Sequence, residues 1–99
     1  MPGNPLETIT AMDPLFMEFI KGSEKLVFDD GALPRKFKLL IALAFDAAHG
    51  AGEGVRSLAN SAIKAGSNKQ EISEALRVAY HLSGVGSLYT ASMSLEGLF

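Results

Sequence analysis

The sequence contains no cysteine. This absence excludes disulfide bonds, metal sites built on thiolates and every form of thiol redox chemistry. Long hydrophobic runs are missing as well, because the longest unbroken apolar stretch is the seven residues from Leu39 to Phe45. A membrane-spanning helix needs about 20 apolar residues, so we expect no association with a membrane through such a helix.

An excess of charge of one sign is also lacking. Nine Lys and Arg residues stand against eleven Asp and Glu residues, and the net charge is −2 with both signs interspersed. Such a chain offers neither a basic patch for nucleic acid nor a polybasic anchor for anionic lipid, so neither partner is expected. The amino terminus shows no basic segment followed by an apolar core, which a secretory signal would have. The expected location is the cytoplasm.

Apolar residues, in contrast, are abundant. They make up 47% of the 99 residues, and the mean hydropathy is positive. A single domain of this length buries only about 60–65% of the surface that its unfolded chain exposes, so its own core cannot cover all these side chains. We therefore expect a homo-oligomer, either a trimer, a hexamer or a dimer, that buries the surplus between copies.

The spacing of apolar residues predicts an all-α domain of about five helices at residues 13–99, preceded by an irregular arm at residues 1–12. Offsets of three and four recur along the chain, and no alternation typical of a strand is present. Asp13 before Pro14 marks a helix start. Asn68 and Glu71 form the pattern of a capping box, and Gly66 stands where a left-handed helix cap is expected.

Four segments follow one another in a recognisable order: GALPRK at 31–36, LLIALA at 39–44, AIKAG at 62–66 and EISEALRVA at 71–79. This order resembles the carboxymuconolactone decarboxylase and alkyl hydroperoxide reductase D family across about residues 30–92. The resemblance implies the helical, oligomeric protomer of that family. Because it lies in cap and packing positions, it is more specific for the fold than for the chemistry.

The resemblance also implies where the family site would lie. Peroxidase members carry a Glu, then a Cys-x-x-Cys motif twelve residues on, then a His four beyond the second Cys and eight before the capping glycine. Counted back from Gly66, these positions hold Leu39, Ala51, Gly54 and Leu58. Thiol peroxidase chemistry needs a thiolate, a resolving thiol and a Glu–His relay, none of which these residues supply. The decarboxylase branch also has a His where Leu58 stands.

Three polar residues near this vacated site are the candidate catalytic residues. Asp46, His49 and Glu53 are spaced three and four apart, so on a continuous helix they would share one face. A carboxylate beside an imidazole makes a general acid–base pair, and three such groups can hold a divalent metal. The alternative is a solvated helix end with His49 near the negative pole of the helix dipole, which the glycines at positions 50, 52 and 54 favour.

Tyr80 and His81 are candidates for lining a ligand pocket between helices, with packing as the alternative role. Two functional hypotheses follow. The first is a divergent family member that binds a small apolar or carboxylated ligand or serves a structural role. The second is an acid–base enzyme that acts on a lactone or similar carboxylated compound through Asp46, His49 and Glu53. Neither hypothesis includes a cofactor or a resident metal.

Overall fold

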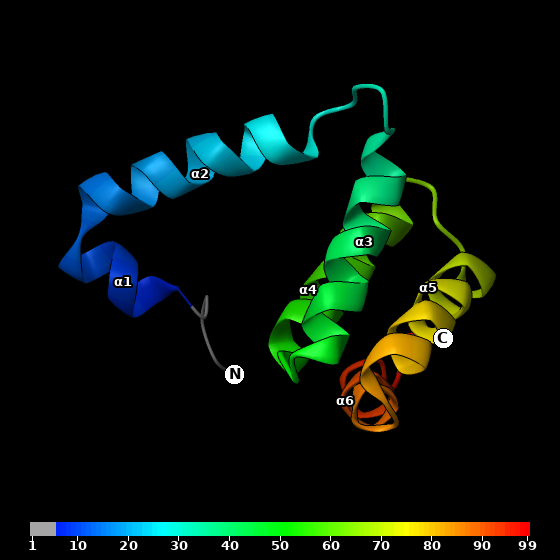
Figure 1. Ribbon diagram of the computed structural model, residues 1–99. Coiled ribbons are helices and arrows are strands. Elements are labelled where there is room, and N and C mark those ends of the chain that lie inside the picture. Colours follow the sequence, from blue (N-terminus) through cyan, green and yellow to red (C-terminus); the bar gives the residue numbers. More distant parts are fainter. Residues whose placement is uncertain (1–5) are drawn as a thin grey trace.

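The computed structural model describes residues 6–99, and this part of the chain contains helices and no strand (Figure 1). The all-α class is therefore confirmed. The helices are α1 (Glu7–Met12), α2 (Pro14–Phe28), α3 (Arg35–Ala48), α4 (Gly52–Lys64), α5 (Lys69–Ser83) and α6 (Gly86–Ser94). Their number exceeds the predicted five because α1 forms inside the segment that was expected to be irregular.

Helix α1 corrects the prediction of an irregular arm over residues 1–12. Within this segment, residues 1–5 lie outside the described residues, whereas Glu7–Met12 are helical. Glu7 lies in the first turn, where a negative charge suits the helix dipole. The Oγ1 of Thr10 donates a hydrogen bond to the carbonyl of Leu6 at 2.9 Å. The prolines and the glycine within the first twelve residues all precede α1 in the sequence.

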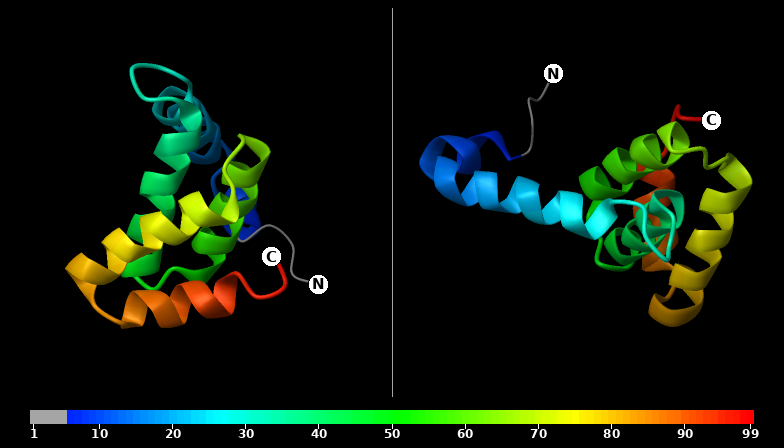
Figure 2. Two further views of the ribbon diagram at one scale, coloured as in Figure 1. Left: turned by 90° about the vertical axis from the view of Figure 1, so that its right-hand side faces the viewer. Right: turned by 90° about the horizontal axis from the view of Figure 1, so that it is seen from above.

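Helix α2 begins at Pro14, as predicted. The Asp13 carboxylate accepts a hydrogen bond from the Phe16 backbone N–H at 3.1 Å, and proline at the first helical position gives up no intrahelical bond. The helix passes through Gly22 without a break. Helix α1 packs on α2, and together they form an arm that projects away from the other helices (Figure 2).

Helices α3 to α6 form the body of the molecule. α3 packs against α4 and α5, and α6 contacts all three of them. Leu39 is only 2% exposed and lies in the core. The core cluster consists of Leu39, Leu40, Leu43, Ala47, Val55, Ala59, Ala62, Ile72 and Ala91. Many of these side chains are small, so the helices approach closely but each buries a limited apolar area.

The start of α5 follows the predicted capping pattern. Gly66 takes a φ of +104°, a conformation that glycine adopts without steric cost. The Asn68 side chain accepts a hydrogen bond from the Glu71 N–H at 2.8 Å, and the Glu71 carboxylate accepts one from the Asn68 N–H at 3.1 Å. These reciprocal bonds satisfy amides that the helix itself leaves without partners.

The last helix, α6, ends at Ser94, whereas the predicted helical domain extends to residue 99. An Arg56 guanidinium nitrogen, from α4, donates hydrogen bonds to the carbonyls of Ser94 and Glu96, each at 2.9 Å. A side chain that is distant in the sequence therefore satisfies carbonyls at this helix end. No local sequence pattern near the end of α6 could have predicted these bonds.

Candidate functional site

The chain turns back between Asp46 and Glu53, and this turn breaks up the predicted catalytic cluster. α3 ends immediately before His49, and Gly50 takes a φ of +76° that requires glycine-like freedom. α4 then begins at Gly52. Because the helix is interrupted, as the glycines at positions 50, 52 and 54 favoured, Asp46, His49 and Glu53 do not share one helical face.

His49 lies apart from the two carboxylates. Its side chain is exposed, and its ring stacks on Phe45 with 6.2 Å between the ring centroids. Within residues 6–99 the His49 imidazole has no hydrogen bond or ion pair with a carboxylate. This is the geometry of a solvated helix end, which was the alternative to a catalytic role.

Asp46 and Gly54 face each other across the turn. The Asp46 side chain lies against the first turn of α4, so that a Cβ at position 54 would come within 2.9 Å of the Asp46 Cγ and closer still to a carboxylate oxygen. The residue that precedes α4, Ala51, has no side chain that can cap the helix. The Asp46 carboxylate therefore supplies negative charge beside the positive end of α4.

Asp46 and Glu53 both line a pocket of about 500 Å³ between the arm and the body. The third carboxylate of this pocket belongs to Glu24 of α2. We call it the acidic pocket; its lining residues are Leu6, Glu24, Phe28, Ala42, Asp46, Glu53, Gly54, Ser57 and Leu58. No Lys or Arg is among them. Three carboxylates repel an anion and attract a cation or a hydrogen-bond donor, while the apolar lining residues suit a hydrocarbon group.

Of the four positions of the lost family site, one lies in the core, two line this pocket, and one lies in neither. Leu39 is buried in the core, and Ala51 is the residue before α4. Gly54 and Leu58, which stand where the resemblance places the second Cys and the His, both line the acidic pocket. Two of the four positions therefore border a pocket whose ionisable lining residues are carboxylates.

Sequence reasoning missed Glu24 and Ser57 as pocket residues. Ser57 follows Gly54 at an offset of three and precedes Leu58, so helical periodicity could have placed it on the same face. Glu24 had no comparable signal, because it reaches the pocket only through the packing of the arm. Among residues 6–99, no group of three or more His, Cys, Asp or Glu side chains is arranged to hold a metal ion.

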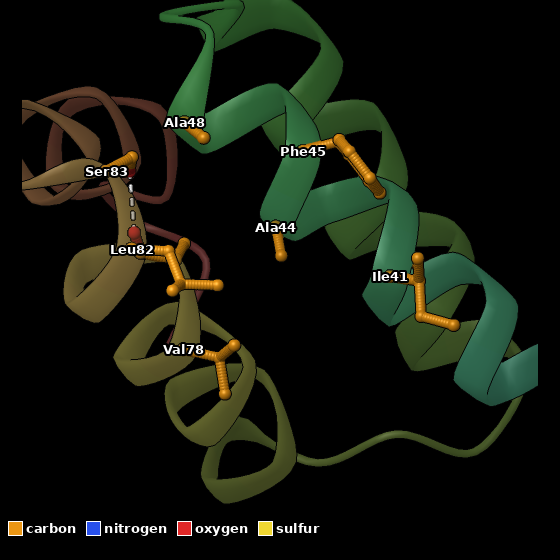
Figure 3. A pocket seen from close by; sticks show the side chains of 8 residues that line it. Ile41, Ala44, Phe45, Ala48, Val78, Leu82 and Ser83 are labelled. Atoms are coloured by element: carbon orange, nitrogen blue, oxygen red, sulfur yellow. Dashed lines mark hydrogen bonds between the residues drawn. The ribbon is translucent and has the colours of Figure 1, made fainter.

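Tyr80 and His81 line neither the acidic pocket nor the other pockets described in this section. Both side chains are exposed on α5. Their neighbours Val78 and Leu82 point instead toward α3 (Figure 3). A helix turns by about 100° per residue, so these two positions fall on another face of α5.

A second pocket, of about 300 Å³, lies between α3 and α5 and is apolar (Figure 3). We call it the apolar groove; it is lined by Ile41, Ala44, Phe45, Ala48, Val78, Ala79, Leu82 and Ser83. The Ser83 hydroxyl donates its hydrogen bond to the Ala79 carbonyl at 2.6 Å, so it presents no unpaired donor to the groove. A third pocket, between α2 and α3, shares Ile41 and Phe45 with this groove.

Helices α3 to α6 pack into one body, and a pocket lies beside the α3–α4 turn. This arrangement identifies the chain as a small all-helical domain. The model of the carboxymuconolactone decarboxylase family matches residues 14–94, and the chain belongs to this family. The family resemblance read from the sequence is thus confirmed. α1 precedes the matched region.

A solved structure agrees with this assignment. The crystal structure of apo-lpg0406, a carboxymuconolactone decarboxylase family protein from Legionella pneumophila, is similar with a TM-score of 0.83 at 27% sequence identity. The similarity covers 92% of this chain and 81% of that chain. No curated protein matches the sequence. None of the helices at residues 6–99 is long and apolar enough to cross a membrane, and the cytoplasmic location stays a prediction.

Proposed function

We propose that this family member binds a small basic ligand in the acidic pocket and has no thiol peroxidase activity. One observation carries the proposal: the pocket persists beside the vacated family position at Gly54, and its ionisable lining residues are the carboxylates of Glu24, Asp46 and Glu53. A protonated amine attached to an apolar group matches this lining, because the cation pairs with carboxylates while the hydrocarbon contacts Phe28.

The absence of peroxidase activity follows from chemistry. Thiol peroxidases attack the peroxide bond with a thiolate, and the sequence has no cysteine to provide one. Reduction of an organic hydroperoxide by dithiol reductants should therefore run at the same rate with and without the protein. Protein-dependent turnover would contradict this part of the proposal.

The charge of the pocket weighs against the carboxylated ligand, one of the two ligand classes that the sequence left open, the other being a small apolar ligand. A carboxylated ligand would bring a further negative charge next to Asp46 and Glu53, with no Lys or Arg in the lining to offset the repulsion. The same argument weighs against a carboxylated lactone as substrate. Of the acid–base alternative, only the pair of Asp46 and Glu53 remains, because His49 does not line the pocket.

Two probes of similar shape and opposite charge test the proposal. Benzylamine and benzoate should be titrated into the isotopically labelled protein while amide resonances are followed by NMR. We expect benzylamine to shift the amides of Asp46, Gly54 and Ser57, and benzoate to leave them unchanged. Binding of benzoate in preference, or binding of neither compound, would contradict a site for basic ligands.

Charge-removing variants locate the bound amine. Asp46→Asn and Glu53→Gln should each weaken benzylamine binding by about tenfold, the scale of one hydrogen bond to a charged group. Glu18→Gln is the matched control, because it removes one exposed carboxylate from α2 at a position that does not line the pocket. Equal weakening in the control would indicate that benzylamine responds only to net charge.

A further inference from the structure

The α2 arm joins the body at a corner, and two basic side chains at the start of α3 hold the end of the arm. Lys38 donates a hydrogen bond from its Nζ to the carbonyl of Asp29 at 2.7 Å. A guanidinium nitrogen of Arg35 donates to the carbonyl of Phe28 at 3.5 Å. Both carbonyls lie at the end of α2, where a helix leaves its last carbonyls without partners and its dipole favours a positive charge.

These donors differ from an ordinary helix cap because they come from the next helix. The basic residue in the last turn of α2 itself, Lys25, pairs instead with the Asp29 carboxylate at 3.1 Å. A donor on α2 would satisfy a carbonyl without restricting the direction of the helix. A donor on α3 reaches the carbonyl only while α2 keeps its present angle to α3, so these hydrogen bonds restrict the corner (Figure 1). The connecting loop is held as well, because the Asp30 carboxylate accepts a hydrogen bond from the Arg35 N–H at 2.6 Å.

The angle of α2 also sets one wall of the acidic pocket. Glu24 and Phe28 line this pocket from α2, whereas most of the other lining residues belong to α3 and α4. Phe28 also lines the pocket between α2 and α3, and Lys38 lines that second pocket with it. Glu24 lies one helical turn before Phe28, about 6 Å along α2. A rotation at the corner therefore moves the Glu24 carboxylate relative to the carboxylates of the body.

We propose that Lys38 is a positioning residue of the acidic pocket, because its hydrogen bond to Asp29 holds the α2 arm at the angle that makes Glu24 part of the pocket. This inference rests on the proposed function, since it assigns control of the same ligand site. Lys38 does not line the acidic pocket, so it acts through the arm and touches no ligand. Its bond has the length of a charge-assisted hydrogen bond, which is about twice as strong as a neutral one. The longer contact of Arg35 contributes less.

The distance between the arm and the body reports the position of the arm without a ligand. Because the sequence has no cysteine, spin labels can be attached at Glu18→Cys on α2 and Asn60→Cys on α4, both exposed and outside the pockets described above. Pulsed electron–electron double resonance on labelled protein, mixed with an excess of unlabelled protein, measures label pairs within one chain.

We expect a narrow distance distribution when Lys38 is present and a broader one in Lys38→Met. Lys38→Arg should restore the narrow distribution, because the guanidinium supplies a charged donor again. Lys64→Met is the matched control, since it removes an exposed ammonium that forms no ion pair among residues 6–99. The same distribution in Lys38→Met as in the wild type would overturn the proposal.

Benzylamine titrations show whether the arm acts on the pocket. Glu24→Gln should weaken binding by about tenfold when Lys38 is present, the scale of one hydrogen bond to a charged group. In Lys38→Met the same change should weaken binding by less than about threefold, because a displaced Glu24 contributes little. Asp46→Asn, on the body, should weaken binding equally in both backgrounds.

Equal effects of Glu24→Gln in the two backgrounds would overturn the proposal, because Lys38 would then not act through the arm. If the wild-type protein bound no benzylamine, the proposed function alone would fail. The distance distributions need no ligand, so they would still decide whether Lys38 holds the arm.

Discussion

The side chain of Asp46 lies over Gly54 and occupies the space into which a side chain at position 54 would extend. Gly54 is the position at which the family resemblance places a catalytic cysteine, and it now lines a pocket together with the Asp46 carboxylate. A larger residue at position 54 therefore requires Asp46 to move. A side chain at position 54 and the Asp46 carboxylate in its present position exclude each other.

This contact predicts that the effect of Gly54→Ala depends on Asp46. Alanine is favoured over glycine in a helix by about 0.5–1 kcal/mol, and this gain should appear in full in an Asp46→Ala background. With Asp46 present, the displaced carboxylate should offset much or all of it. Urea denaturation of the four proteins in a double-mutant cycle measures the coupling. Gly22→Ala is the control, because a Cβ there meets no atom within 4 Å. Identical effects of Gly54→Ala in both backgrounds would refute the contact.

Leu39 should tolerate neither truncation nor charge. Because the side chain is 2% exposed within the core cluster, Leu39→Ala should lower the free energy of unfolding by about 2–5 kcal/mol. Leu39→Glu, which restores the acidic residue type of the peroxidase site, should cost more, because it buries a carboxylate without a partner. Leu39→Met keeps the volume and should cost less than about 1.5 kcal/mol. Denaturant unfolding followed by circular dichroism gives these values, and a Leu39→Glu protein as stable as the wild type would contradict the placement.

His49→Ala should leave both the fold and the ligand affinity nearly unchanged. The imidazole is exposed and lies outside the acidic pocket, so the expected change in unfolding free energy is within about 0.5 kcal/mol. Benzylamine affinity should match that of the wild type, in contrast to the loss expected for Asp46→Asn. If His49→Ala lost as much benzylamine affinity as Asp46→Asn, His49 would contribute to the ligand site, contrary to this prediction.

Glu71 should make stability depend on acidic pH. The pKa of its carboxyl is lowered, first by the hydrogen bond from the Lys36 ammonium and then by the bond from the Asn68 backbone N–H. A lowered folded-state pKa means that this stabilisation is complete above the ordinary Glu value of about 4.3 and is lost as the pH falls through the folded-state value. Glu71→Gln removes the charge while glutamine still suits the capping box.

Thermal melts of both proteins between neutral pH and about pH 3 test this expectation. The wild type should melt at a higher temperature than Glu71→Gln at neutral pH, and the difference should shrink on acidification. Glu18→Gln, which removes an exposed carboxylate without an ion pair, should show no such convergence with the wild type. A difference that is constant across the pH range would exclude the ion pair with Lys36 as its source.

The sequence by itself determined the helical class, the family, the absence of thiol chemistry and several helix ends. These features depend on short-range rules or on composition: the caps at Asp13 and Asn68 need only residues within one helical turn, and the lack of cysteine needs no fold at all.

The tertiary structure alone decided which polar residues meet. The spacing of Asp46, His49 and Glu53 fits a continuous helix, but the positive φ of Gly50 breaks that helix and separates the imidazole from the carboxylates. Glu24 joins the pocket only because α2 packs on α3 and thereby borders the same pocket as residues of α4. Local propensities fix helices and their caps, whereas the composition of a pocket depends on how whole helices pack against one another.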